Sequence, residues 1–233
     1  MKKILAEAAA PSKRDFSEET HWEKAAKTCM GKYLTRTETQ FIQNSIDLSR
    51  INAVMDVGAE AGRFSQFPTE NTLVISIDID SYGLKRLKLK AKHVNAVQAD
   101  ARKIPLKTET LDAILMIEVL DYIPELLDAL AECYRTLKPG ASLIVSFGNK
   151  SSLKAKLRET RGKSYMHSYS SVMHSLLKTG FKVKKRMGYS WLLFGRTSEN
   201  PLIPVLTTAE KIFGLRKIPK YSPWVIIHAA KPD

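Results

Sequence analysis

The sequence predicts an α/β fold, a mostly parallel sheet with helices on both faces, and two observations predict it. From residue 51 onward, short apolar runs alternate with longer polar segments of helical periodicity, a pattern typical of parallel sheets covered by helices. The chain has 233 residues, of which 44% are hydrophobic and 26% charged, so it can form one such domain with its own core. We expect this domain over residues 51–233, after a helical cap segment over residues 1–50.

Seven apolar runs are the expected strands. A stretch that can form a helix follows each of the first four runs, most clearly Tyr122–Leu137, whose leucines recur at helical spacing before Pro139-Gly140 ends it. The runs are Ala53–Val57, Leu73–Asp78, Ala96–Ala101, Ala113–Ile117, Ser142–Phe147, Phe181–Met187 and Trp224–Ala229.

Two further helices are expected near the last two strands. Ser170 can cap a helix that stops at Gly180. Between the two strands lies an insertion near residues 189–222, which is too long for a hairpin loop. Within it, residues 207–210 have the form of a capping box and predict a helix through Leu215.

The charge of the chain is strongly basic and unevenly distributed. The net charge is +13, and from Lys150 to Arg186 there are eleven Lys or Arg against one acid, Glu159. Such a field favours anionic partners: nucleic acid, a phospholipid surface or an acidic small substrate. The alternative is that these side chains only solvate helix faces.

Cysteine usage and hydropathy indicate the compartment. Cys29 and Cys133 lie far apart and match no metal or redox spacing, so we expect no metal site and a reduced, cytoplasmic chain. The apolar stretch after Met1 is interrupted by Glu7, far short of a signal peptide. No window approaches the roughly 18 apolar residues that a membrane span needs, so we predict no transmembrane segment.

The turn after the first expected strand is the strongest functional signal. It reads Asp56-Val57-Gly58-Ala59-Glu60-Ala61-Gly62. Glycine lets a ligand approach the backbone, but the spacing is not the G-x-G-x-x-G of a dinucleotide site. Glu60 would repel a pyrophosphate and tolerate the cationic methionine end of S-adenosylmethionine. The alternative is a tight connection from the strand to the start of a helix.

Acids stand at the ends of the next two strands. Asp78 follows the glycine turn by about 20 residues, which is the position of an acid that accepts hydrogen bonds from ribose hydroxyls. Asp80 fits better as the cap of the helix that follows. Asp100 is placed to accept a hydrogen bond from an adenine amino group. These acids predict a nucleoside site at the carboxyl edge of the sheet.

These segments, together with the string E-x-x-R-x-L-K-P-G over residues 132–140, resemble the motifs of class I S-adenosylmethionine-dependent methyltransferases over residues 50–148. The similarity is greatest to the type 11 and ubiquinone/menaquinone-biosynthesis branch. The resemblance implies a Rossmann-like, seven-stranded sheet with an antiparallel last strand, and S-adenosylmethionine as cofactor. It implies that the cofactor-binding residues are Asp56, Gly58, Glu60, Gly62, Asp78, Ile79, Asp100, Ala101 and Ile117.

The chain departs from the family pattern at two positions. Glu60 stands where the family usually has glycine, which would narrow the methionine pocket or weaken cofactor binding. Tyr122 stands where the family often has histidine, so no base is available at that point. A relative that binds the cofactor without catalysis is therefore one alternative. A non-catalytic binding module, which keeps the cofactor fold only as a scaffold for a partner, is another.

The acceptor is less well indicated. The stretch 117–120 lacks the N/D-P-P-Y/F string of adenine- and cytosine-N methyltransferases, which argues against that chemistry. His167 could act as a catalytic base, or it could be a surface histidine beside a helix cap. The basic block, by which we mean the Lys- and Arg-rich stretch from Lys150 to Arg186, is followed by Trp191–Phe194. Positive charge next to apolar residues predicts an acceptor with an anionic group and an apolar body, or one presented at a phospholipid surface.

We therefore expect methyl transfer to an O, N or C atom of a small or lipid-like acceptor, with the N-terminal helices and the insertion covering it. An RNA methyltransferase is the alternative that the basic surface favours.

Overall fold

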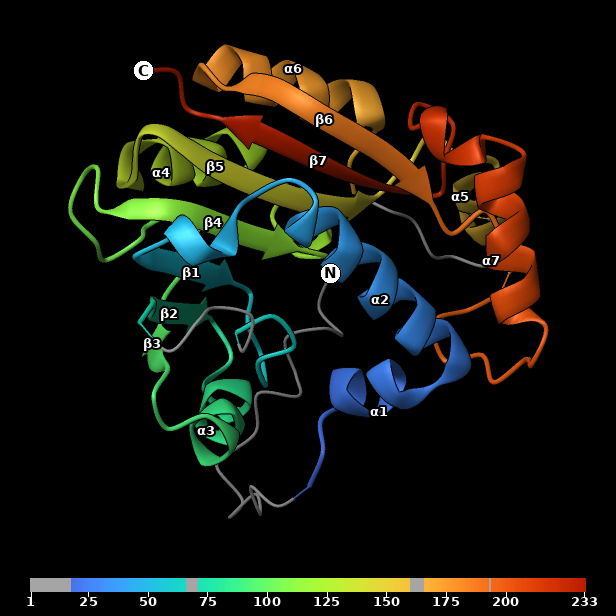
Figure 1. Ribbon diagram of the computed structural model, residues 1–233, viewed down its shortest axis with the longest axis horizontal. Coiled ribbons are helices and arrows are strands. Elements are labelled where there is room, and N and C mark those ends of the chain that lie inside the picture. The colour runs from blue at the N-terminus through green and yellow to red at the C-terminus, as the bar shows by residue number, and fades with distance from the viewer. Residues whose placement is uncertain (1–17, 66–70, 160–165, 193) are drawn as a thin grey trace, which may run out of the picture.

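The computed structural model describes residues 18–65, 71–159, 166–192 and 194–233 (Figure 1). Its centre is a seven-stranded sheet of order β3-β2-β1-β4-β5-β7-β6. β7 is antiparallel to both neighbours, and the other strands are parallel to one another. The fold class is thus confirmed. The strands are β1 (Ala53–Val57), β2 (Leu73–Asp78), β3 (Asn95–Gln98), β4 (Leu111–Ile117), β5 (Leu137–Gly148), β6 (Lys182–Tyr189) and β7 (Trp224–Ala230).

The helices cover the two faces of this sheet. One core cluster joins α4 and α6 to the sheet, and the other joins α2, α3 and α7 to the opposite face. Figure 1 shows α2 in front of the sheet, with α4 and α6 behind it. The helices are α1 (His21–Lys27), α2 (Cys29–Gln43), α3 (Ser81–Lys90), α4 (Leu126–Thr136), α5 (Leu153–Glu159), α6 (Tyr169–Thr179) and α7 (Ile203–Ile212), with short 3₁₀ turns η1 (Leu48–Arg50), η2 (Leu120–Tyr122) and η3 (Leu215–Lys217).

Apolar patterning explains why the strands and helices take these places. All five residues of β1 are buried, as expected of a central strand in a parallel sheet with both faces covered. α2 buries Leu34, Phe41 and Ile42 on one face, at the i, i+7 and i+8 positions of an amphipathic helix. Because these elements place the carboxyl ends of β1, β2 and β4 beneath α1 and α2, they define where a ligand can enter.

Two expected connections are not helical. The described residues between β1 and β2 form turns, and so does the segment from Asp100 to Thr110 that joins β3 to β4. Pro105 in the second segment lacks the backbone N–H that a helix interior uses. The predicted strand at Ala96–Ala101 is also shorter, because β3 ends at Gln98.

Three helix boundaries differ from the prediction. α4 ends at Thr136, and β5 begins at once, so Pro139-Gly140 lie within the strand instead of ending the helix. The cap of α6 is Ser168, whose hydroxyl accepts a hydrogen bond from the Ser171 N–H, while Gly180 ends the helix as predicted. α7 begins at Ile203 and has a proline in its first turn, which places Thr207 in its middle.

The edge strand β6 carries part of the basic block. Its residues Lys182, Lys184, Lys185 and Arg186 are exposed. Lysines on an edge strand oppose pairing with a strand of another chain. This accounts for part of the positive charge between residues 150 and 186 without an anionic ligand.

Within the described ranges, none of the helices combines the length and apolar character that a bilayer-spanning segment needs.

Candidate functional site

A large cavity opens at the carboxyl ends of β1, β2 and β4, the edge at which open α/β sheets bind ligands. Its volume is about 1900 Å³, and α1, α2, Ser190 and residues 194–197 form the opposite wall. All nine residues predicted to bind the cofactor line it: Asp56, Gly58, Glu60, Gly62, Asp78, Ile79, Asp100, Ala101 and Ile117. The structure therefore brings the predicted cofactor residues together.

The glycine turn is tied to the end of β2. The N–H groups of Gly58 and Ala59 both donate to the carbonyl oxygen of Ile77, at 2.8 and 3.1 Å. The N–H of Glu60 donates to Oδ2 of Asp78 at 2.8 Å. Glu60 has a φ of +45°, a left-handed conformation that residues other than glycine rarely adopt. The turn thus keeps the backbone shape expected of a glycine while carrying a carboxylate.

Asp78 has acceptor capacity left for a ligand. Its Oδ1 accepts a hydrogen bond from the Asp80 N–H at 2.8 Å, in addition to the bond from Glu60. Since a carboxylate offers about four lone-pair sites, the described residues leave two of them free for a ligand. Asp80 caps α3 by accepting from the N–H of Tyr82, which agrees with the prediction for that residue.

Asp100 is more committed to its own neighbours than the sequence indicated. Its carboxylate forms an ion pair with Arg102, whose Nη2 lies 2.6 Å from Oδ2, and this pairing lowers the pKa of Asp100. Arg102 also pairs with Glu125. A hydrogen bond from Asp100 to an adenine amino group would have to share the carboxylate with Arg102.

Asp56 is a buried carboxyl at the floor of the cavity. The Ser65 hydroxyl donates to its Oδ2 at 2.7 Å, and the Ser76 hydroxyl donates to Ser65. Burial raises the pKa of Asp56 to about 7, against the opposing hydrogen bond from Ser65. At neutral pH this group therefore exchanges between its neutral and charged forms.

An Asp56→Asn variant is expected to have a flatter pH dependence of stability than the parent chain. Because the folded pKa lies above the unfolded value of about 3.9, the Asp56 proton stabilises the fold at low pH. This contribution is lost as the pH rises toward 7, by up to about 1.4 kcal/mol per pH unit. Urea unfolding of both proteins at several pH values between about 4 and 7 measures the difference. Equal slopes would show that Asp56 does not titrate in this range.

A charge cluster of four residues lies next to the glycine turn, and we call it the buried ion cluster: Glu38, Arg63, Glu118 and Arg196. Nη2 of Arg63 lies 3.2 Å from Oε2 of Glu38 and 3.1 Å from Oε1 of Glu118. Arg196 contacts the other oxygen of Glu118. Burial lowers the pKa of Arg196 to about 10, which leaves it charged at neutral pH.

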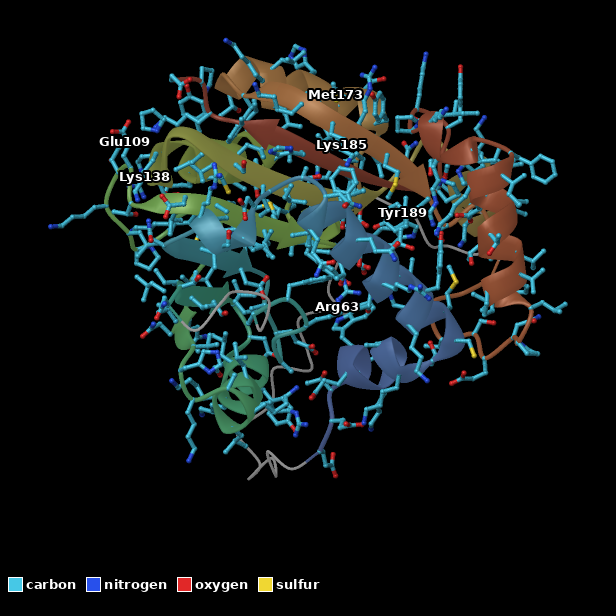
Figure 2. All side chains as sticks on the ribbon, viewed as in Figure 1. Arg63, Glu109, Lys138, Met173, Lys185 and Tyr189 are labelled. Carbon is cyan, nitrogen blue, oxygen red and sulfur yellow. The ribbon has the colours of Figure 1, made fainter. Side chains whose placement is uncertain are left out.

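The buried ion cluster joins distant parts of the chain. Glu38 is fully buried on α2, and its Oε1 accepts a hydrogen bond of 2.6 Å from the Tyr189 hydroxyl. Arg63 and Tyr189, labelled in Figure 2, approach α2 from the glycine turn and from the end of β6.

One member of the buried ion cluster has an unusual backbone conformation, because Glu118 has a φ of +62°. Backbone strain of this kind concentrates at functional sites.

The far end of the cavity is aromatic. The Arg196 guanidinium lies 4.7 Å from the ring centroid of Trp22 and 5.7 Å from that of Trp224. Phe194 is part of the same wall. Lys154 is buried beneath it and donates to the carbonyl oxygens of Leu192 and Phe194, at 2.8 and 2.9 Å. Lys154 therefore anchors this wall and is not part of the exposed basic surface.

The lining of the cavity has a charge opposite to that of the protein. Its acids outnumber its Lys and Arg residues, in a chain of net charge +13, and a site of this kind favours a ligand with positive charge. The acids are Glu19, Glu23, Asp56, Glu60, Asp78, Asp80, Asp100, Glu118, Asp121 and Glu125; the bases are Lys27, Arg63, Arg86, Lys90, Arg102, Lys154 and Arg196.

The structure gives His167 a different place from the one expected. It is buried, it is not among the residues that line the cavity, and its Nε2 donates to the carbonyl oxygen of Ile123 at 2.8 Å. Since Ile123 lines the cavity, His167 contacts the cavity only indirectly, through its hydrogen bond to the backbone of Ile123. The structure therefore does not bring the ring of His167 to the cavity, where a general base for an acceptor would have to lie.

Comparison with known proteins agrees with the resemblance found in the sequence. Residues 55–145 match the family model Methyltransf_11, described as a methyltransferase domain. This match supports a similarity of the chain to the class I S-adenosylmethionine-dependent methyltransferases. The matched span begins within β1 and ends within β5, so it covers the glycine turn and both strand-end acids.

Two curated relatives extend the comparison. A ubiquinone/menaquinone biosynthesis C-methyltransferase of Erwinia tasmaniensis is 33% identical over 120 residues, which are 47% of this chain and 48% of the relative. A malonyl-[acyl-carrier protein] O-methyltransferase of Methylococcus capsulatus is 29% identical over 184 residues, 73% of this chain and 64% of the relative. The chain thus spans about half the length of the first relative.

A solved structure has the same fold. The N-methyltransferase NodS from Bradyrhizobium japonicum, in complex with S-adenosyl-L-homocysteine, covers 95% of this chain and 96% of its own, with a TM-score of 0.65 and 15% identity. At this identity the likeness concerns the fold alone.

Several residues of the site were missed from the sequence. Glu38 had a readable signal, because it shares the apolar face of its helix with Leu34 and Ile42 at i−4 and i+4. Arg196 and Trp224 had none, because they are far apart in sequence and meet only in the folded chain, where Trp224 begins β7.

Proposed function

We propose that this methyltransferase transfers a methyl group from S-adenosylmethionine to an O, N or C atom of a small or lipid-like acceptor held in the same cavity. The observation that carries the proposal is the size and continuity of that cavity. At about 1900 Å³ it exceeds the roughly 300–1,000 Å³ of a pocket for one ligand. It extends from the predicted cofactor residues to the aromatic wall, so it has room for two ligands.

The residues present fit the cofactor. Asp78 has two lone-pair sites free for ribose hydroxyls, and the surplus of acids in the lining suits a sulfonium with an ammonium group. S-adenosylmethionine, when bound, supplies the activated methyl group. No metal-binding cluster of His, Cys, Asp or Glu occurs among the described residues.

The protein's contribution is alignment and exclusion of water. Asp78 and the glycine turn fix one end of the cavity, and Trp22, Phe194 and Trp224 enclose the other. An acceptor between them would lie in a largely apolar space beside the Glu118–Arg196 pair. Holding the two reactants in line in a closed site supplies much of the rate enhancement in reactions of this kind.

The relatives support the acceptor class. Two of them are named for ubiquinone/menaquinone biosynthesis and for a malonyl group on an acyl carrier protein, which are consistent with a lipid-like or acyl acceptor here. We also propose a cytoplasmic location, which suits the free thiols of Cys29 and Cys133.

The first test is binding followed by transfer. Titration calorimetry should show binding of S-adenosylhomocysteine, and methyl-labelled S-adenosylmethionine should transfer label to quinol, phenol or fatty-acyl acceptors in a panel. Absence of cofactor binding would contradict the proposal. Binding without transfer to any acceptor in a broad panel would favour a non-catalytic relative.

Asp78→Ala is expected to weaken cofactor binding by about 1–3 kcal/mol, because hydrogen bonds to a charged group are lost. Asp80→Ala is the matched comparison: it removes the cap of α3, which costs about 1 kcal/mol of stability, and largely retains binding. Calorimetry and thermal unfolding of both variants separate the effects. If Asp80→Ala loses the cofactor and Asp78→Ala keeps it, the ribose assignment passes to Asp80.

A further inference from the structure

An exposed apolar surface extends over α7, η3 and the residues that follow, and we call it the α7–η3 face. It consists of Leu202, Val205, Ile212, Phe213, Ile218 and Tyr221. Ile212 and Phe213 are each 75% exposed and Val205 is 68% exposed. Such large apolar side chains are rarely gathered on the surface of a protein without a partner.

The helical part of this surface is a continuous stripe. At 100° per residue, Leu202, Val205, Ile212 and Phe213 fall within an arc of about 100°. The face of α7 that packs on the protein is a different one and carries Ile203, Thr207 and Glu210. The exposed stripe is therefore a second apolar face, which the fold of the chain does not use.

The exposed charged residues within residues 201–222 are all positive. Lys211, Lys217 and Lys220 are exposed beside the stripe, and Arg216 is half-buried. The single acid between residues 201 and 222 is Glu210, which is buried and accepts hydrogen bonds from the Tyr33 hydroxyl and the Trp191 N–H. Apolar side chains with lysines at their border match the interface of an anionic bilayer.

The α7–η3 face is structurally connected to the cavity. Glu210 holds α7 to the segment that begins at Ser190, and Lys154 of α5 holds the same segment through Leu192 and Phe194. Leu157, on α5, is 48% exposed and also lines the cavity. Figure 1 shows α7 at the outer edge of the molecule, on the side opposite to α4.

We propose that the α7–η3 face binds the surface of an anionic phospholipid bilayer, with the apolar stripe inserted among the headgroups and the lysines against the lipid phosphates. A second copy of the chain fits less well, because a two-fold interface would set this basic surface against itself. Nucleic acid would leave Val205, Ile212 and Ile218 uncovered. Bilayer contact is independent of the proposed reaction, but it would bring a lipid-dissolved acceptor to the cavity side of the enzyme.

Vesicle co-sedimentation tests this proposal. The full chain should sediment with phosphatidylcholine vesicles that contain phosphatidylglycerol, much less with phosphatidylcholine alone, and less as salt screens the lysines. Ile212→Ser with Phe213→Ser should reduce the partition coefficient about tenfold or more, since two large apolar groups no longer leave water. Lys217→Glu with Lys220→Glu should have a similar effect on anionic vesicles.

Matched controls come from other exposed positions. Leu89→Ser on α3 and Leu177→Ser on α6 remove side chains that are 66% and 59% exposed, and both should bind vesicles like the parent chain. Lys182→Glu with Lys184→Glu, on the edge strand, controls for net charge. Calorimetry with S-adenosylhomocysteine should be unchanged in all these variants, so failure of vesicle binding and failure of the proposed reaction are distinguishable.

Three results would overturn the proposal: the parent chain ignores both vesicle types, the α7 variants bind as well as the controls, or the edge-strand variant loses as much binding as Lys217→Glu with Lys220→Glu. A dimer in light scattering that Ile212→Ser with Phe213→Ser converts to a monomer would instead assign the face to a second copy.

Discussion

A Gly58→Val variant is expected to lose cofactor binding entirely and to fold less stably than the parent chain. Gly58 has a φ of +69°, a region that costs an L-residue about 1–2 kcal/mol and that β-branched residues almost never adopt. An added Cβ would also lie 2.3 Å from Cγ2 of Val119. The glycine is thus required by the backbone and by a neighbouring side chain, even before a ligand approaches.

A compensated pair separates these causes. Gly58→Ala with Val119→Ala makes room for the new Cβ, so it should recover part of the stability that Gly58→Ala loses. If the cofactor lies against the turn, the pair should still bind S-adenosylhomocysteine far more weakly than Val119→Ala alone. Calorimetry and urea unfolding measure the two quantities, and normal binding by the pair would make the turn a structural connection only.

Glu38→Ala is expected to destabilise the fold by about 3–5 kcal/mol, the range for breaking a buried ion pair by removing one partner. Glu38 is fully buried, and its loss leaves the Tyr189 hydroxyl without its acceptor and Arg63 with one carboxylate fewer. For a chain of this length the melting temperature should fall by roughly 6–20 °C.

Two comparisons define the origin of this loss. Glu38→Gln keeps an oxygen that can accept from Tyr189 and loses only the charge, so we expect an intermediate decrease. Arg36→Ala, at an exposed position of the same helix, should change stability by no more than about 0.5 kcal/mol. If Glu38→Gln is as unstable as Glu38→Ala, charge and not hydrogen bonding is the dominant contribution.

The part of the fold that follows apolar periodicity was predictable. The bounds of β1 and β2 agree with the apolar runs, and the antiparallel last strand followed from the resemblance. Helix ends were less predictable because they depend on single interactions. At residues 207–210 the form of a capping box was misleading, since the Thr207 hydroxyl donates to the Pro204 carbonyl within a helix that has already begun.

The site was predictable to the extent that its residues follow strands directly. Gly58, Asp78 and Asp100 stand at strand ends, and parallel strands end on one edge. The buried ion cluster was not predictable, because Glu38, Arg63 and Arg196 are far apart in sequence and meet only through tertiary packing. The placement of His167 was not predictable either, because proximity to a capped helix says nothing about whether a side chain reaches the cavity.

The position of β7 has a consequence for synthesis of the chain on the ribosome. β7 lies between β5 and β6, although both precede it in sequence. While the chain is being translated, β5 therefore exposes an unpaired edge and β6 has no place in the sheet until Trp224–Ala230 emerges. An open apolar edge of this kind is prone to aggregation and is a target for chaperones. The lysines of β6 would keep the waiting segment in water during this interval, and ribosome-bound chains halted before Trp224 should be more sensitive to protease than chains halted after residue 233.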